Sequence, residues 1–576
     1  MANEQAIADE TPQSIPASEP IADWDLRPWV LGALLALCGL GLHFVTLDYD
    51  TYTAINPERS PEHWRAGIAG FLFFGGLAAA FALDRDKWYE AGLFAVLIGL
   101  IMGGISYNVV RLEDHKVGGE FAFAAGVFFT LLAVPLFQAG FHRLRFATDY
   151  RTSHFHVWAD AISAAGALAF TGLSWLMLLL LDQLFGLLGI ELIGDLIDNA
   201  WFAWIWSAGA FGAALGVLRE NLKIIGALQN VVMLVFALLA VPLAAALVVF
   251  LVLLLASGGS ALWEATDSAT PILLACAAGS FVLFNAIIRD SDDNRSRNRV
   301  MQAAGAVLAA VILPLVVFAA IGMGLRINQH GLSPERIWAL IAIAVAAAYG
   351  IAAWVALARG RLAGWSAALR RANLHLAVVV CAVAFVLAMP FWDFGAVAAR
   401  NQVARLESGK TALAEFDFIA LRWDFGDSGR AVLAQLAAGE GERAELAAAA
   451  QSQTERIWDW QREQQRKGFT GKLRVQSDDP ALEGRVRLYL DANPWRCDTY
   501  CVALDLGEKP DGLREVALVQ GFDYTRLLLN TQGQEVPPPT PATAAEGLKA
   551  ASTVEIREET VRYIYVDGKR MGVPVE

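Results

Sequence analysis

Eleven long apolar runs fill the chain before residue 393, and they restrict its possible folds more than any other feature. Each run is roughly 18 to 30 residues long, the length that a helix needs to cross the hydrocarbon core of a bilayer. With 56% hydrophobic and only 18% charged residues, the chain is too apolar for an ordinary soluble protein. The predicted spans are 29–47, 66–83, 91–110, 121–141, 155–181, 200–218, 224–255, 271–288, 300–325, 337–358 and 374–392.

Two stretches depart from a simple crossing. The run 224–255 is longer than one crossing needs, so we expect it to tilt, to kink near Pro242 or to project from the membrane. The stretch 182–199 is apolar but carries acidic residues at helical spacing and neither Lys nor Arg. This pattern predicts an amphipathic helix in the membrane interface, with a re-entrant segment as the alternative.

The basic residues of the loops predict the orientation, because Lys and Arg accumulate in short cytoplasmic loops. One alternate set of loops holds sixteen of them and the other holds six. The N-terminus is therefore expected in the cytoplasm, and an odd number of spans places residue 393 onward outside. The larger set is Arg27, Arg85, Lys87, Arg143, Arg145, Arg151, Arg219, Lys223, Arg289, Arg295, Arg297, Arg299, Arg359, Arg361, Arg370 and Arg371; the smaller is Arg59, Arg65, Arg111, Lys116, Arg326 and Arg336.

These observations predict three regions and a bacterial inner-membrane location. Residues 1–28 are acidic, rich in Pro and Ser, and lack a basic n-region, which indicates a disordered cytoplasmic tail and not a signal peptide. Residues 29–392 form an all-α polytopic membrane bundle of about eleven transmembrane helices. Residues 393–576 form a C-terminal α+β periplasmic domain.

The predicted external domain begins with helical sequence and continues with short strands. The Ala-rich segments 397–406, 431–438 and 453–465 indicate helices. We predict strands over 485–490, 501–506, 515–520 and 526–529, and a last pair over 554–557 and 561–566 with Asp567-Gly568 as a turn.

Cysteine and histidine usage limits the chemistry of this domain. Cys497 and Cys501 are its only cysteines, and an oxidising compartment would join them; two separate thiols or a metal half-site are the alternatives. All eight histidines precede residue 393, so the domain has no Ser-His-Asp triad and no histidine-bound zinc site. We assign no catalytic, cofactor-binding or metal-binding residue. Neither half of the chain is basic, which argues against a nucleic-acid partner.

Asp160 is the one carboxylate inside the predicted spans, about one turn into the fifth. A carboxylate in lipid is a functional candidate by default, but a side chain near a membrane face can also reach water or cap a neighbouring helix. Gly99 with Gly103, and Gly212 with Gly216, have the small-xxx-small spacing that allows close helix contact.

The loop before the tenth span carries a helix-start signal. Ser333 is a predicted N-cap and Pro334 suits the first helical position. This loop and the segment after residue 392 are where a membrane enzyme acting on lipid-linked substrates would place its site. The possible functional residues there are Arg326, Arg336, Arg400, Asn401 and Arg405.

Three separated segments resemble one protein family. They are the run GLRINQHGLSPERIW, the run FWDFGAVAARNQVARLESGKTALAEFDFIALRWDFGDSGR and the run HVWADAISAAGALAFTGLSWLMLLLLDQLFGLLGI. Together they are similar to the bacterial integral-membrane family called domain of unknown function 4153, over roughly residues 142–436. The resemblance implies the same membrane architecture and supplies no catalytic residue.

Three function classes are compatible with the sequence. The first is an envelope structural or interaction protein, in which the bundle sits in the lipid bilayer and the external domain binds a periplasmic envelope protein. The second is a solute transporter, although the spans show neither charged midplane sites nor paired broken helices. The third is the enzyme acting on lipid-linked substrates. We expect the first.

Overall fold

The computed structural model describes residues 24–46, 62–258, 269–453, 456, 468–477, 479–497, 500–509, 512–520, 523–536, 563–566 and 569–571. The chain divides into two compact units, Met1–Gln451 and Ser452–Glu576. Most of the predicted tail, most of the predicted helix 453–465 and the predicted strand 554–557 lie outside the described residues.

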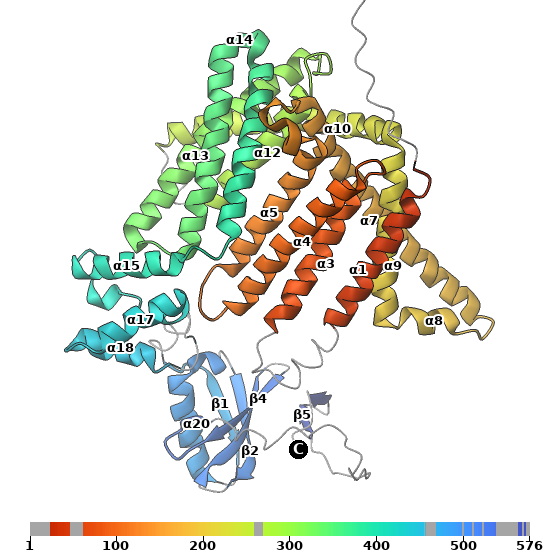
Figure 1. The fold of residues 1–576 in the computed structure, drawn as a ribbon. Helices are drawn as coiled ribbons and strands as arrows, with labels where there is room; N and C mark the ends of the chain where they lie inside the picture. Colours follow the sequence, from red (N-terminus) through yellow and green to blue (C-terminus); the bar gives the residue numbers. More distant parts are fainter. Residues whose placement is uncertain are drawn as a thin grey trace, which may run out of the picture. The chain divides into compact units, whose positions relative to one another are not determined.

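In the described residues of the first unit, every regular secondary-structure element is a helix (Figure 1). Eleven candidate spans occur there, as predicted, with α14 supplying two of them, Pro334–Gly360 and Gly364–Ala388. The chain is thus a multi-pass membrane protein by the length and composition of its helices. The helices are α1 (Arg27–Thr46), α3 (His63–Ala82), α4 (Trp88–Arg111), α5 (Gly119–Gln138), α6 (Phe141–Leu144), α7 (Tyr150–Gly186), α8 (Leu192–Ile197), α9 (Ala200–Glu220), α10 (Leu222–Ala256), α12 (Thr270–Ile288), α13 (Arg299–His330), α14 (Pro334–Ala388), α15 (Phe394–Glu407), α16 (Phe418–Trp423), α17 (Gly426–Ala437) and α18 (Glu442–Gln451).

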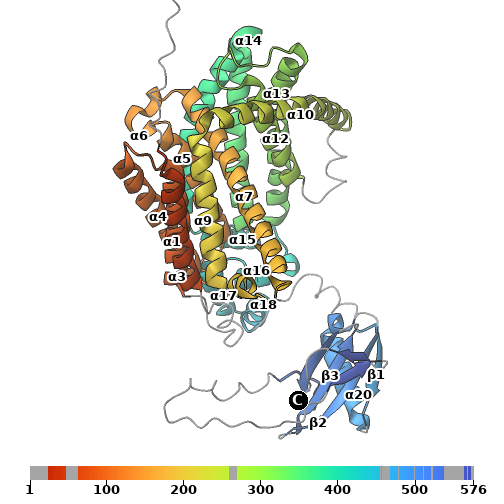
Figure 2. The same ribbon diagram turned by 90° about the vertical axis from the view of Figure 1, so that its right-hand side faces the viewer.

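Helices α10 and α8 depart from the direction of the bundle. Figure 2 shows α10 running across the end of the bundle where α9 ends, with Pro242 in its interior. Leu238, Val249 and Leu253 of α10 are exposed in the isolated chain, as expected for a helix whose outer face contacts lipid. In the stretch 182–199, α7 continues to Gly186 and only the short α8 follows, at the opposite end of the bundle and without re-entering it (Figure 1).

Glycines bring α4 against α3 and α9 against α1, at the spacing that the sequence indicated. A Cβ atom added to Gly103 would lie 2.7 Å from the carbonyl oxygen of Gly67, and one added to Gly212 would lie 2.5 Å from that of Leu31. Backbones at this distance exclude any side chain. The predicted close contacts are therefore confirmed.

Ion pairs join loops that the charge pattern assigned to one side. Arg27, at the start of α1, pairs with Asp84 after α3 at 3.3 Å and with Glu220 at the end of α9 at 3.0 Å. Arg370 pairs with Asp292 of the α12–α13 loop at 2.6 Å, and its hydrogen bond lowers the pKa of that carboxyl group. These contacts place several of the basic loops at one end of the bundle, as the alternation of spans requires.

The helices α15 to α18 belong to the first unit by their contacts. They share a small core of their own that includes Ala398, Leu421 and Leu433. The first unit therefore extends beyond the last span to Gln451.

The second unit contains a four-stranded sheet in the order β1-β2-β3-β4. The strands are β1 (Lys472–Gln476), β2 (Tyr500–Glu508), β3 (Arg514–Gln520) and β4 (Asp523–Leu529). β1 is parallel to β2 and the other pairs are antiparallel. Helix α20 (Pro480–Ala492) connects β1 to β2, as a parallel connection requires.

The predicted strand 485–490 is wrong, because these residues lie within α20. Asp479 accepts a hydrogen bond from the backbone N–H of Ala481, and Pro480 occupies the first turn. The buried residues Leu482, Val486 and Tyr489 fall on one helical face. The other three predicted strands of the sheet are present, and β1 is an additional one.

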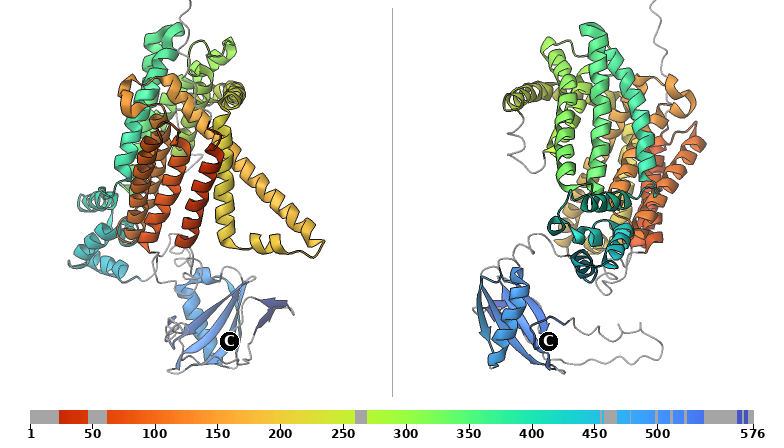
Figure 3. Two further views of the ribbon diagram at one scale, coloured as in Figure 1. Left: turned by 45° about the vertical axis from the view of Figure 1, so that its right-hand side comes forward. Right: turned by 90° about the vertical axis from the view of Figure 1, so that its left-hand side faces the viewer.

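Both faces of the sheet are apolar. Helix α20 lies along one face of the sheet (Figure 3), and its buried residues share a core with Ala503, Val516 and Leu518. Ile564 of the hairpin β5 (Ile564–Val566) and β6 (Lys569–Met571) joins Ala517 and Val519 on the other. The predicted turn residues 567–568 lie between β5 and β6 but outside the described residues.

Candidate functional site

The α13–α14 loop is held by side chains of α15. Ser333 caps α14, as predicted, by accepting a hydrogen bond from the backbone N–H of Arg336. Asn401 accepts from the N–H of Leu332 at 2.9 Å, and Arg405 donates to the carbonyl oxygen of Gln329 at 2.8 Å. We call this arrangement, in which Asn401 holds the loop and Arg405 holds the last turn of α13, the loop clamp.

Two further side chains strengthen the loop clamp. Gln402 donates to the carbonyl oxygens of His330 and Leu332 at 2.8 and 2.9 Å. Arg336 donates to that of Gly331 at 2.7 Å. Gln402 was not predicted, and only its spacing of i, i+3 from Arg405 along α15 could have indicated it.

The five predicted site residues are thus brought together only in part. Arg336, Asn401 and Arg405 meet on the loop backbone, Arg326 is half-buried on α13, and Arg400 is exposed and donates to Ala396 of its own helix. The groups that meet are engaged with backbone atoms, so they stabilise the joint between bundle and α15.

A second joint connects α17 to the α4–α5 loop, and it was not predicted. The ring of His115 lies 2.7 Å from a carboxylate oxygen of Asp427, whose backbone N–H donates to the carbonyl oxygen of His115 at 2.9 Å. Arg430 hydrogen-bonds the carbonyl oxygen of Asp114 and pairs with Asp427. Hydrogen bonds from Arg430 and His115 lower the pKa of the Asp427 carboxyl group. Asp427 lies in the first turn of α17.

Asp160 lies deeper in its helix than predicted, because α7 begins at Tyr150 and not near residue 155. One carboxylate oxygen accepts a hydrogen bond from Gln138 of α5 at 3.1 Å. Gln138 also donates to the carbonyl oxygen of Phe81 at the end of α3 at 2.7 Å. The other oxygen of Asp160 is buried and makes no hydrogen bond with the described residues. Asp160 therefore helps to join α3, α5 and α7.

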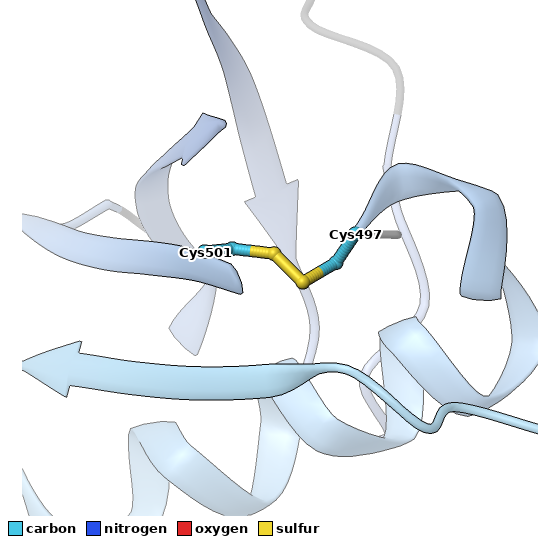
Figure 4. Close-up of a disulfide and its surroundings, with 2 residues drawn as sticks. All are labelled: Cys497 and Cys501. Carbon is cyan, nitrogen blue, oxygen red and sulfur yellow. A yellow bond between two sulfur atoms is a disulfide. The ribbon is translucent and has the colours of Figure 1, made fainter. Parts of the chain in front are cut away.

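Cys497 and Cys501 form a disulfide, as predicted, with Cα atoms 5.9 Å apart (Figure 4). Both are fully buried in the core between α20 and the sheet. Within the described residues, no group of three or more His, Cys, Asp and Glu side chains could hold a metal ion.

Residues 71–436 match the family described as Domain of unknown function (DUF4153). The chain belongs to this family. The DUF4153 region extends from α3 to α17, so it contains the loop clamp and the second joint and ends before the disulfide-bonded unit. No curated protein and no solved structure matches the chain.

Proposed function

We propose that this DUF4153 protein is a bacterial inner-membrane protein that holds its C-terminal unit in the periplasm and acts through contacts of that unit with another envelope protein. The observation that carries the compartment is the buried Cys497–Cys501 disulfide, because disulfides persist in oxidising compartments. The excess of basic residues in the loops on the side where α1 begins supports the same orientation.

The contact function is supported by the shape of the second unit. Among the described residues, β1 pairs only with β2 within the sheet, so its other edge carries backbone groups that an extended peptide can pair with. Lys472, Arg474 and Gln476 of β1 are exposed. An added strand from a partner would use this edge.

The transporter alternative has less support. Asp160 is the one carboxylate within the predicted spans. Its hydrogen bond to Gln138 joins two helices, so its presence is explained by helix packing and does not require a transport role. The enzyme alternative is weakened because Asn401 and Arg405 are engaged with the backbone of the loop.

Reporter fusions test the compartment. A periplasm-active reporter fused after Ser408 should be active, and one fused after Gly364 should be silent. The reverse pattern would overturn the orientation.

Photo-crosslinking in living cells tests the contact. A photoreactive residue in place of Arg474 should capture an envelope protein. The matched control carries the same residue in place of the exposed Leu488 on α20 and should not capture it. Truncation after Gln451 leaves the first unit whole and should abolish complementation of the deletion phenotype. Full complementation by this truncated chain would refute the proposal.

A further inference from the structure

A cavity of about 1050 Å³, partly open to the surface of the bundle, lies between α5, α7, α12, α13 and the two halves of α14. Along α5 it extends from Phe121 to Leu136, about 23 Å at a rise of ~1.5 Å per residue. Half of the hydrocarbon core is roughly 15 Å thick, so the cavity is longer than one leaflet. Its wall is almost wholly apolar, with alanines of α12 and α14 leaving the space open.

Polar side chains gather at the end of the cavity where α7 begins. His154 is only 7% exposed and lines the cavity, yet neither of its ring nitrogens has a hydrogen-bond partner among the described residues. Asn373, 6% exposed, donates to the side-chain oxygen of Asn285 at 2.9 Å, while its own side-chain oxygen has no partner there. Buried polar groups normally have partners, so these two side chains retain unused hydrogen-bonding capacity.

Three arginines lie near this end, but none of them lines the cavity; Arg289 donates to the side-chain oxygen of Asn230 at 2.9 Å. Arg370 binds Asp292 at 2.6 Å and donates to the carbonyl oxygen of Ile288 at 2.9 Å. Arg151 pairs with Asp290 at 3.2 Å. An anionic headgroup would need a cation on the cavity wall, whereas His154 and Asn373, which do line it, suit an uncharged hydroxyl or ester group.

We propose that this cavity binds an uncharged long-chain lipid, with its hydrocarbon chain between α5 and α14 and its hydroxyl or ester group bonded to His154 and Asn373. An apolar cavity among membrane helices favours a hydrocarbon chain over water. A hydroxyl group can accept from one ring nitrogen of His154 and donate to the free oxygen of Asn373. The site lies wholly in the first unit and is independent of the partner proposed for the second.

Photolabelling of the full-length protein in lipid nanodiscs tests the site. The probes are three C16 compounds that carry a diazirine in the chain: a monoacylglycerol, a hexadecane and a palmitate. The monoacylglycerol should label peptides of α5 and α14 at the cavity wall. Ala342→Trp fills the cavity and should reduce this labelling about tenfold, whereas Ala344→Trp, on the same helix but not on the cavity wall, should leave it unchanged.

The polar end is tested by His154→Leu. Loss of one hydrogen bond should lower monoacylglycerol labelling about three- to tenfold and leave hexadecane labelling unchanged. His156→Leu, a half-buried histidine off the cavity wall, is the matched control. Should Ala342→Trp fail to elute as a folded protein, Ala124→Phe fills the same cavity from α5.

Two results would overturn the proposal. Equal labelling of wild type and both cavity-filling variants would mean that the probes contact only the outer surface of the bundle. Stronger labelling by palmitate than by monoacylglycerol would mean that the polar end selects an anion.

Discussion

The contact between α3 and α4 allows a sharp test, because two adjacent glycines of α4 have opposite surroundings. A Cβ atom on Gly103 would lie 2.7 Å from the backbone oxygen of Gly67, whereas one on Gly104 would meet nothing within 4 Å. Gly→Ala within a helix stabilises by about 0.5–1 kcal/mol when space is available. Forcing an extra carbon into packed helices costs about 1–3 kcal/mol. The helix-forming gain is common to both variants, so Gly103→Ala should be less stable than Gly104→Ala by about 1–3 kcal/mol.

This difference should be visible in the thermal midpoints. Taking about 2 °C per kcal/mol for a chain of this size, Gly103→Ala should melt about 2–6 °C below Gly104→Ala. Both variants are purified in the same detergent, heated in steps and measured by the tryptophan fluorescence of the folded peak in size-exclusion chromatography. A midpoint for Gly103→Ala at or above that of Gly104→Ala would refute the close contact.

Three further outcomes follow from the structure. Asn401→Ala leaves the N–H of Leu332 without its partner and should destabilise the α13–α14 loop by about 1–2 kcal/mol. Limited proteolysis should then cleave this loop faster than in the wild type, and an unchanged cleavage rate would contradict the loop clamp. Replacing Cys497 and Cys501 by Ser should lower the unfolding free energy of the second unit by about 2 kcal/mol, the value for a disulfide that closes a short loop. Denaturant titration measures this difference, and equal stability of the variant and the wild type would count against a stabilising role of the disulfide. Asp160→Asn keeps a side-chain oxygen for Gln138, so the variant should complement the deletion phenotype; failure to complement by a folded variant would favour the transporter.

Local patterns were sufficient where one segment determines its own structure. The spans could be predicted because crossing a bilayer requires apolar length, a property of each segment alone. Ser333 could be recognised as a cap for the same reason. The prediction failed for residues 485–490, where apolar and polar residues alternate as in a strand, while the helical face of α20 appears only over its whole length from Pro480.

The sequence by itself therefore determined the membrane class, the family, the spans, the close glycine contacts and the cysteine pairing. The loop clamp, the joint between His115 and Asp427, and the cavity were decided only by the tertiary structure. His115 and Asp427 are far apart in the chain, and their partners are set by how helices pack. The cavity is likewise made of alanines and single polar residues from separate helices, each of which looks like ordinary helix packing until those helices meet.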